Sequence, residues 1–211
     1  GAYTVDEGGI YIDGVDVTGL SEHRRAKYIG RVFQDPMMGT AATMQIEENL
    51  ALAARRGKIR TLIPGITRKE RSEYKEMLKI LDLGLEDRMT AKVGLLSGGQ
   101  RQALTLLMAT MRKPKLLLLD EHTAALDPKT AAKVLEVTEK IVSRDNLTTL
   151  MITHNMRDAI AYGNRLIMMY DGKIVVDVSG EEKKSLTVEQ LLALFSKASG
   201  SDEADDKLLL G

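Results

Sequence analysis

Two short apolar runs, each followed by polar residues, constrain the fold of this chain more than any other feature. The first run, "KLLLLDE", spans Lys115 to Glu121, and the second, "TTLMITH", spans Thr148 to His154. Continuous apolar runs of this length are typical of strands that are buried on both faces of a parallel sheet. Ligands of open parallel sheets bind outside the carboxyl ends of the strands, so the polar residues that end both runs become candidates for a functional site.

Two further segments predict antiparallel hairpins. In "GGIYIDGVDVTG" the apolar residues alternate about Asp13-Gly14, and "RLIMMYDGKIVVDV" turns at Asp171-Gly172. An Asp-Gly pair between alternating apolar residues is a strong signal for a tight hairpin turn. The sequence therefore predicts an antiparallel part beside the parallel strands.

The stretches between the strands predict helices. Thr67 to Glu70 forms a capping box, Asp127 precedes a proline at a first helical position, and Thr187 to Gln190 starts a short helix that ends near Phe195. Ser97 stands before two glycines and a helical run; its hydroxyl can cap that helix, whose free N–H groups and partial positive charge make an anion site.

The order of these elements predicts an α/β fold with a parallel sheet core, an antiparallel β part and an inserted helical subdomain. Strands and helices alternate over residues 95–178, whereas residues 46–89 look helical without clear strands. We expect one domain over residues 1–196, with the helical subdomain at about 35–97. Residues 197–211 form an acidic tail that we expect to be disordered.

Composition excludes several classes of protein. The 211 residues include 30 Lys and Arg against 30 Asp and Glu, so net charge gives no argument for a nucleic-acid partner. The absence of cysteine excludes a disulfide scaffold and a thiolate metal site. No apolar run approaches the ~18–20 residues that span a bilayer, so we expect any work at a membrane to be done through a partner.

Four polar residues at predicted strand ends suit phosphate chemistry. Asp120 can hold Mg²⁺ through water, and Glu121 can orient or deprotonate a water that attacks a phosphate. His154 can bond a phosphate oxygen or that water, and Gln34 can ligate Mg²⁺ or a water. Taken singly, each residue is better explained structurally: Asp120 and Glu121 as turn caps, His154 as a hydrogen-bonded histidine at a sheet edge, and Gln34 as a solvated loop residue.

Taken together, the motifs resemble the ATP-binding cassette (ABC) ATPase family. The Gln34 loop, "LSGGQ", "LLLLDE", "ALD" and the final Thr-His pair occur in the order of that family's Q-loop, signature, Walker B strand, D-loop and switch histidine. The resemblance extends from about Gly8 to Phe195. It implies a P-loop NTPase-like fold, ATP and Mg²⁺ as cofactors, and a second ABC ATPase subunit that pairs head to tail with this one.

The resemblance also implies roles for individual residues. Glu121, His154 and Gln34 become catalytic, while Asp120 and Gln34 become metal ligands. In the family the signature contacts the ATP held by the other cassette, and the D-loop aspartate lies beside the nucleotide. The implied nucleotide-binding residues are Ser97, Gly98, Gly99 and Gln100 toward the partner's ATP, and Asp127.

The sequence departs from the family at the P-loop, because G-x-x-x-x-G-K-[ST] does not occur in it. Three interpretations remain open: a fragment, a degenerate paralogue, or a cassette completed by another chain. The surviving Asp120, Glu121 and His154 favour a fragment, incomplete at its amino terminus, with a P-loop upstream of Gly1. We expect the 211 residues alone not to hydrolyse ATP. His122 stands where the family usually has proline, and we assign it no role.

Within the family, an importer-type subunit fits best. Residues 35–96 hold only short helices instead of a long coiled coil, and the chain carries one partial cassette without a membrane domain. We expect an integral membrane permease and a substrate-binding protein as partners, no nucleic acid, and a cytoplasmic location on the inner face of the membrane. The expected cargo is a small molecule such as an amino acid. The alternative function is a non-catalytic or soluble nucleotide-dependent interaction module.

Overall fold

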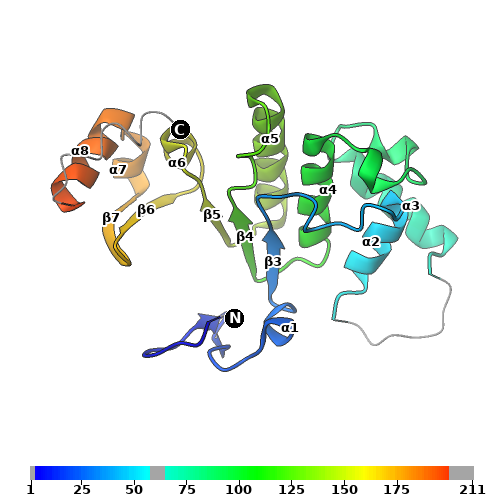
Figure 1. Ribbon diagram of the computed structural model, residues 1–211, viewed down its shortest axis with the longest axis horizontal. Helices are drawn as coiled ribbons and strands as arrows, with labels where there is room; N and C mark the ends of the chain where they lie inside the picture. The colour runs from blue at the N-terminus through cyan, green and yellow to red at the C-terminus, as the bar shows by residue number, and fades with distance from the viewer. Residues whose placement is uncertain (1–2, 58–64, 200–211) are drawn as a thin grey trace. The chain divides into compact units, whose positions relative to one another are not determined.

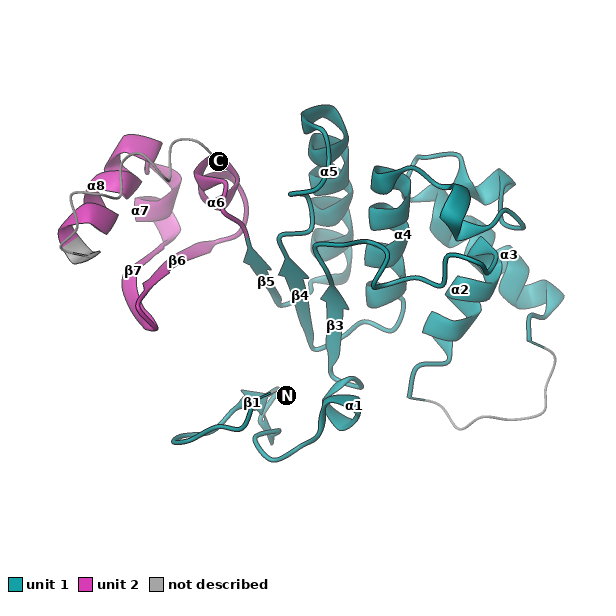
Figure 2. Cartoon of the chain, viewed as in Figure 1, with its two compact units in different colours: residues 1–152 teal, residues 153–211 magenta. Residues whose placement is uncertain are grey.

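The computed structural model describes residues 3–57 and 65–199 and divides into two compact units. The first unit is Gly1–Ile152 and the second is Thr153–Gly211 (Figures 1 and 2). The predicted tail falls largely on residues 200–211, which lie outside the described residues. No helix within the two described ranges is both long enough and apolar enough to cross a membrane.

A three-stranded parallel sheet forms the centre of the first unit. It has the order β3 (Ile29–Val32), β4 (Leu116–Asp120) and β5 (Thr149–Ile152). The two apolar runs therefore do form neighbouring parallel strands, and the predicted α/β class is confirmed.

The expected burial of both sheet faces is wrong for β5 among the residues that the structure describes. Leu117 and Leu119 of β4 are buried in the same core cluster as residues of α4 (Gly98–Thr110) and α5 (Pro128–Asp145). In contrast, Leu150 and Ile152 of β5 are each about half exposed. The pleat sends alternate side chains to opposite faces, and the described helices of this unit cover only one of them.

Each of these two helices begins at the predicted cap. The Ser97 hydroxyl accepts a hydrogen bond from the Gln100 amide at the start of α4, and the Asp127 carboxylate accepts one from the Thr130 amide at the start of α5. The other end of α4 lies close to the sheet, because a Cβ at Gly30 of β3 would stand 2.7 Å from the carbonyl oxygen of Ala109.

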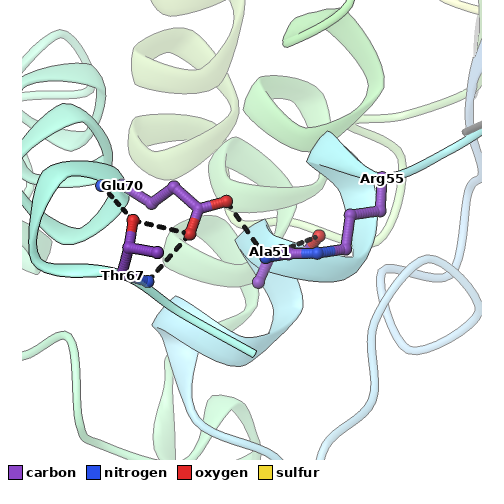
Figure 3. Close-up of polar contacts among 4 residues, drawn as sticks. All are labelled: Ala51, Arg55, Thr67 and Glu70. Atoms are coloured by element: carbon purple, nitrogen blue, oxygen red, sulfur yellow. Dashed lines mark hydrogen bonds and ion pairs between the residues drawn. The ribbon is translucent and has the colours of Figure 1, made fainter. Parts of the chain in front are cut away.

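Among its described residues, the helical part of the first unit contains two α-helices and two short 3-10 turns: α2 (Ile46–Ala54), α3 (Arg68–Lys79), η1 (Leu85–Asp87) and η2 (Val93–Leu95). The capping box at Thr67 is confirmed, and Figure 3 shows the Glu70 carboxylate between Thr67 and Arg55. Arg55, the residue that directly follows α2, donates to that carboxylate at 3.0 Å and to the Ala51 carbonyl. The cap of α3 is thereby tied to α2.

Both predicted hairpins are confirmed. The first joins β1 (Tyr11–Ile12) to β2 (Val15–Asp16) ahead of the short α1 (Glu22–Arg25). Its turn residues Asp13 and Gly14 have φ of 53° and 76°, the left-handed backbone that an Asp-Gly turn supplies.

The second hairpin belongs to the second unit, where β6 (Arg165–Tyr170) pairs with β7 (Lys173–Ser179). Three helices complete this unit: α6 (Met156–Ala161), α7 (Gly180–Lys184) and α8 (Val188–Ser199). Side chains of α8 such as Leu191 and Phe195 join those of the hairpin in a small apolar core of its own.

Candidate functional site

The carboxyl edge of the parallel sheet carries three of the predicted catalytic and metal-binding residues. Gln34 follows β3 and is exposed, Asp120 is the last residue of β4, and Glu121 comes directly after it. Val32 pairs in register with Leu119, so the ends of β3 and β4 lie at the same level of the sheet. The structure thus brings Gln34, Asp120 and Glu121 to one edge.

Asp120 is engaged by a cation from the neighbouring strand. A terminal nitrogen of Arg31 lies 3.1 Å from Asp120 Oδ2, and both side chains are substantially exposed. The Arg31 guanidinium also lies 4.5 Å from the centre of the Phe33 ring. An exposed ion pair of this kind contributes about 0–1 kcal/mol to stability, so a competing cation or ligand can displace it.

The residues present fit Mg²⁺ but not a fully protein-ligated metal. Within the ranges that the structure describes, no group of three or more His, Asp or Glu could hold a metal ion. Mg²⁺ commonly binds through one or two carboxylates together with waters and substrate phosphates. Asp120, partly exposed at the end of a central strand, meets that requirement.

Glu121 has an unusual backbone. Its φ is 43°, in the left-handed region, and its N–H donates to the Ile152 carbonyl oxygen at 3.0 Å. A residue with a side chain in this region carries about 1–2 kcal/mol of backbone strain, and such positions concentrate at functional sites. The chain therefore bends sharply at the residue predicted to be the catalytic base.

Ser97 and Gln100 of the signature segment satisfy each other. Ser97 Oγ accepts from the Gln100 amide at 3.3 Å, while Gln100 Oε1 accepts from the Ser97 amide at 3.2 Å. Gln100 Nε2 also lies 3.5 Å from the Leu83 carbonyl oxygen. Ser97 and Gly98 remain exposed at the start of α4.

The two glycines of the signature have different surroundings. A Cβ at Gly99 would stand 2.0 Å from Thr130 Cγ2 of α5, closer than any real contact, and Gly99 is buried. A Cβ at Gly98 would meet only Leu126 Cδ2, at 3.2 Å. Gly99 is thus required by the packing of α4 on α5 within this chain, a cause that sequence reasoning missed.

Asp127 caps α5 in the same neighbourhood. Its Oδ1 accepts from the Thr130 amide at 3.1 Å, and the hydrogen bonds from Thr130 lower the pKa of Asp127. Thr130 therefore contacts both the signature glycine and the predicted D-loop aspartate. Its place three residues after Asp127 was readable as a capping position, whereas its contact with Gly99 was not.

His122 is a structural residue of the first unit. Its side chain is only 2% exposed, and Nε2 lies 3.2 Å from Thr138 Oγ1. Burial lowers the pKa of His122 to about 4, so the ring is neutral at pH 7. This explains how a histidine is tolerated directly after Glu121.

His154 belongs to the second unit, unlike Gln34, Asp120 and Glu121. It is exposed and precedes Asn155, which caps α6 by accepting from the Arg157 and Asp158 amides. Burial raises the pKa of Asp158, and the charge of His154 opposes that rise. A carboxylate within electrostatic reach thus stands beside the predicted switch histidine.

A parallel α/β sheet with a capped glycine-rich helix start and an acidic strand end is compatible with an ATP-binding cassette, and the comparison with known families decides the class. The sequence matches the family described as "ABC transporter" over residues 1–124. The chain belongs to the ABC transporter family, and the resemblance seen in the motifs is confirmed.

Curated relatives include ATP-binding proteins of tyrosine transport and of methionine import. The tyrosine transport ATP-binding protein of Clostridioides difficile is 47% identical over 191 residues, which cover 90% of this chain and 76% of the relative. The methionine import ATP-binding protein MetN of Streptococcus pneumoniae (strain R6) is 32% identical and covers 99% of this chain. The chain spans only 56% of the length of that MetN.

Solved structures with the same fold are also ABC cassettes. One is the post-hydrolysis dimer of the cassette MJ0796 bound to ADP and Pi, which has a TM-score of 0.68 and 29% sequence identity to this chain. The match covers 84% of this chain and 75% of the MJ0796 chain. The ADP conformation of the cassette MJ1267 has a TM-score of 0.72 at 25% identity, and the match covers 92% of this chain and 78% of the MJ1267 chain.

Proposed function

We propose that this chain is part of an ATP-hydrolysing subunit that powers an amino-acid importer. The observation that carries the proposal is the sheet edge where Asp120 ends β4 and the strained Glu121 follows. The names of the relatives support an amino acid as cargo, since one is a tyrosine transport protein and others are methionine import proteins.

The proposed chemistry is divided among the three residues of the sheet edge and His154 of the second unit. Glu121 serves as the general base toward the attacking water, while Gln34 and His154 orient that water and the phosphate. Asp120 and Gln34 would hold Mg²⁺, which when bound offsets the negative charge of the phosphate oxygens. The exposure of Gln34 and His154 supports these roles, because both side chains are accessible to a nucleotide.

The signature segment acts on the ATP of a second cassette. Ser97, Gly98, Gly99 and Gln100 lie at the start of a 13-residue helix whose N-terminal dipole favours an anion. Asp127 begins the next helix, and Thr130 joins the two helix starts. The dimeric cassette structures among the structural neighbours support a head-to-tail pair.

The helical part contacts an integral membrane permease. Residues 35–89 carry exposed apolar side chains at Met37, Met38 and Leu52, with exposed fractions of 46%, 70% and 56%. Methionine is enriched at protein interfaces, so the exposed Met37 and Met38 support this contact. The subunit then works on the cytoplasmic face of the membrane, beside a permease that receives cargo from a substrate-binding protein.

A non-catalytic nucleotide-dependent module is the second candidate. The observation in its favour is the Arg31–Asp120 pair, which occupies an oxygen of the predicted metal ligand. If this pair persisted with nucleotide present, Asp120 would be a structural partner instead of a ligand. ATP hydrolysis separates the two functions directly.

The test uses the protein expressed from its intact gene, reconstituted with its permease in vesicles. ATP hydrolysis and uptake of labelled tyrosine and methionine are measured, with Glu121→Gln as the inactive control. Hydrolysis-dependent uptake of either amino acid supports the proposal. Nucleotide binding without hydrolysis would favour the non-catalytic module, and hydrolysis without uptake of either would exclude these cargoes.

A further inference from the structure

The segment that carries Gln34 lies directly on the signature helix. Gln102 of α4 donates from Nε2 to the carbonyl oxygen of Phe33 at 3.0 Å, immediately before Gln34. One turn further along α4, Thr105 lies so close to Gly39 that a Cβ there would stand 2.4 Å from Thr105 Cγ2. The segment from Phe33 to Gly39 therefore follows one face of α4.

Further along, the same segment is hydrogen-bonded to the loop that precedes the signature. The Gly94 amide donates to the Ala42 carbonyl at 2.8 Å, and the Val93 amide donates to the Met44 carbonyl at 3.0 Å. Arg101 of α4 donates to the Gly94 carbonyl at 3.2 Å. A continuous set of hydrogen bonds thus connects the Gln34 segment, α4 and the loop before Ser97.

Gln102 is a fully buried polar side chain of this set. It is 0% exposed, and its Oε1 finds no hydrogen-bond partner among the described residues. The orientation of the amide is fixed, because the Phe33 carbonyl only accepts and must face the NH₂ group. A buried acceptor without a donor destabilises the fold, so an apolar residue would fit this position better if packing alone mattered.

We propose that Gln102 is a positioning residue that couples the Gln34 segment to the signature helix. By holding the Phe33 carbonyl on α4, its amide fixes where Gln34 stands relative to the start of that helix at Ser97. This inference rests on the proposed ATPase function.

The test is a double-mutant cycle in the intact ATPase. Gln102→Met keeps the length of the side chain but removes the donor to Phe33. We expect kcat to fall roughly five- to tenfold, the effect of one lost hydrogen bond, with KM for ATP nearly unchanged. Combined with Gln34→Ala, Gln102→Met should lower kcat by less than twofold further, because its effect passes through Gln34.

The matched control is Thr110→Val on the same helix. Thr110 is buried, but its hydroxyl donates only within α4, to the Leu106 and Leu107 carbonyls. We expect Thr110→Val to leave the kcat unchanged in both backgrounds. An equal loss of kcat from Gln102→Met with and without Gln34 would overturn the proposal.

Gln102→Glu gives a second readout. As a carboxylate it cannot donate to Phe33, whereas the protonated acid can, so its kcat relative to the wild type should rise as pH falls. A ratio that does not change with pH contradicts the proposal.

If the wild type does not hydrolyse ATP, the proposed function fails, and hydrogen exchange still tests the coupling. Gln102→Met should then speed exchange at the amides of residues 35–44, and unchanged exchange would overturn it.

Discussion

The start of α4 and the carboxyl edge of the sheet contain the two halves of the proposed chemistry, yet they are built in opposite ways. At the start of α4, Ser97 and Gln100 satisfy each other, and Gly99 is fixed by its neighbour Thr130. At the sheet edge, Glu121 has a strained backbone and Asp120 pairs with an exposed arginine. The first region is closed by contacts within the chain, whereas we propose that the second binds the nucleotide.

The difference shows that the residues of a sequence motif can have a structural cause, a functional cause or both. The signature residues would be favoured at a helix start by local folding alone, because a capping box and a close helix contact require them. Glu121 has a left-handed backbone, as do Asp82 and Lys113 elsewhere in the chain, so its place directly after Asp120 at the sheet edge, and not the strain alone, points to function. Substitutions in the two regions test this contrast.

The largest effect is expected from Glu121→Gln. The amide keeps the shape and the backbone bend but cannot accept a proton, so kcat should fall about 10²–10⁴-fold with ATP binding retained. Steady-state hydrolysis and nucleotide titration measure the two quantities. The control is Glu136→Gln, an exposed position on α5 that should hydrolyse ATP normally. Near-normal turnover by Glu121→Gln would remove this residue from the mechanism.

The residue next to Glu121 makes the stability of the edge depend on pH. The pKa of His122 is about 4 in the folded protein, below its usual 6.5, so the unfolded chain takes up the proton first as pH falls. The contribution of His122 to the free energy of unfolding is fully present above pH 6.5. It decreases by about 3 kcal/mol in total as the pH falls from 6.5 to 4. Urea unfolding at pH 7.5 and 4.5 measures it.

His122→Gln should weaken this acid loss, whereas His23→Gln, at an exposed position, should retain it in full. The comparison between the two variants separates His122 from the carboxylates that also titrate in this range. Equal acid sensitivity in both variants would show that His122 does not carry the effect.

The two glycines of the signature allow the same substitution at adjacent positions. Gly99→Ala should destabilise the first unit by about 1–3 kcal/mol, because its Cβ meets Thr130. Gly98→Ala should change stability by less than about 1 kcal/mol, since alanine favours the helix and only a flexible leucine end must move. Thr130→Ser removes the clashing methyl group and should restore much of the loss in Gly99→Ala. Equal losses at both glycines would contradict the packing argument.

The smallest effect on stability is expected from Arg31→Gln. Breaking its exposed pair with Asp120 should cost at most about 1 kcal/mol, but it should lower the Mg²⁺ concentration needed for half-maximal hydrolysis. Arg165→Gln breaks a comparable exposed pair with Asp177 in the second unit and serves as the control. If both variants leave the Mg²⁺ requirement unchanged, the pair does not compete with the metal.

Features that depend on residues close in sequence could be predicted. The caps at Ser97, Thr67 and Asp127 each involve a residue three positions away, and the hairpin turns lie within two residues. The two parallel strands β4 and β5 could also be predicted, because continuous apolar runs are typical of strands in parallel sheets.

Features that depend on distant residues could not be predicted. The Arg31–Asp120 pair and the Gln102–Phe33 bond join segments that are far apart in the chain, and nothing in the local pattern marks them. The exposure of Leu150 likewise depends on which elements cover the sheet. Sequence therefore located the candidate residues, while the structure was needed to show which of them are constrained.

The most direct test of the account is complementation between two inactive variants, Gly98→Asp and Glu121→Gln. Gly98→Asp places a carboxylate against the phosphate that the signature should meet, while its own sheet edge stays intact. In a mixed pair, one composite site combines the normal edge of one cassette with the normal signature of the other. We predict that mixing the two proteins restores ATP hydrolysis well above the sum of the separate activities. A mixture that remains as inactive as its components would contradict a signature that acts on the partner's ATP.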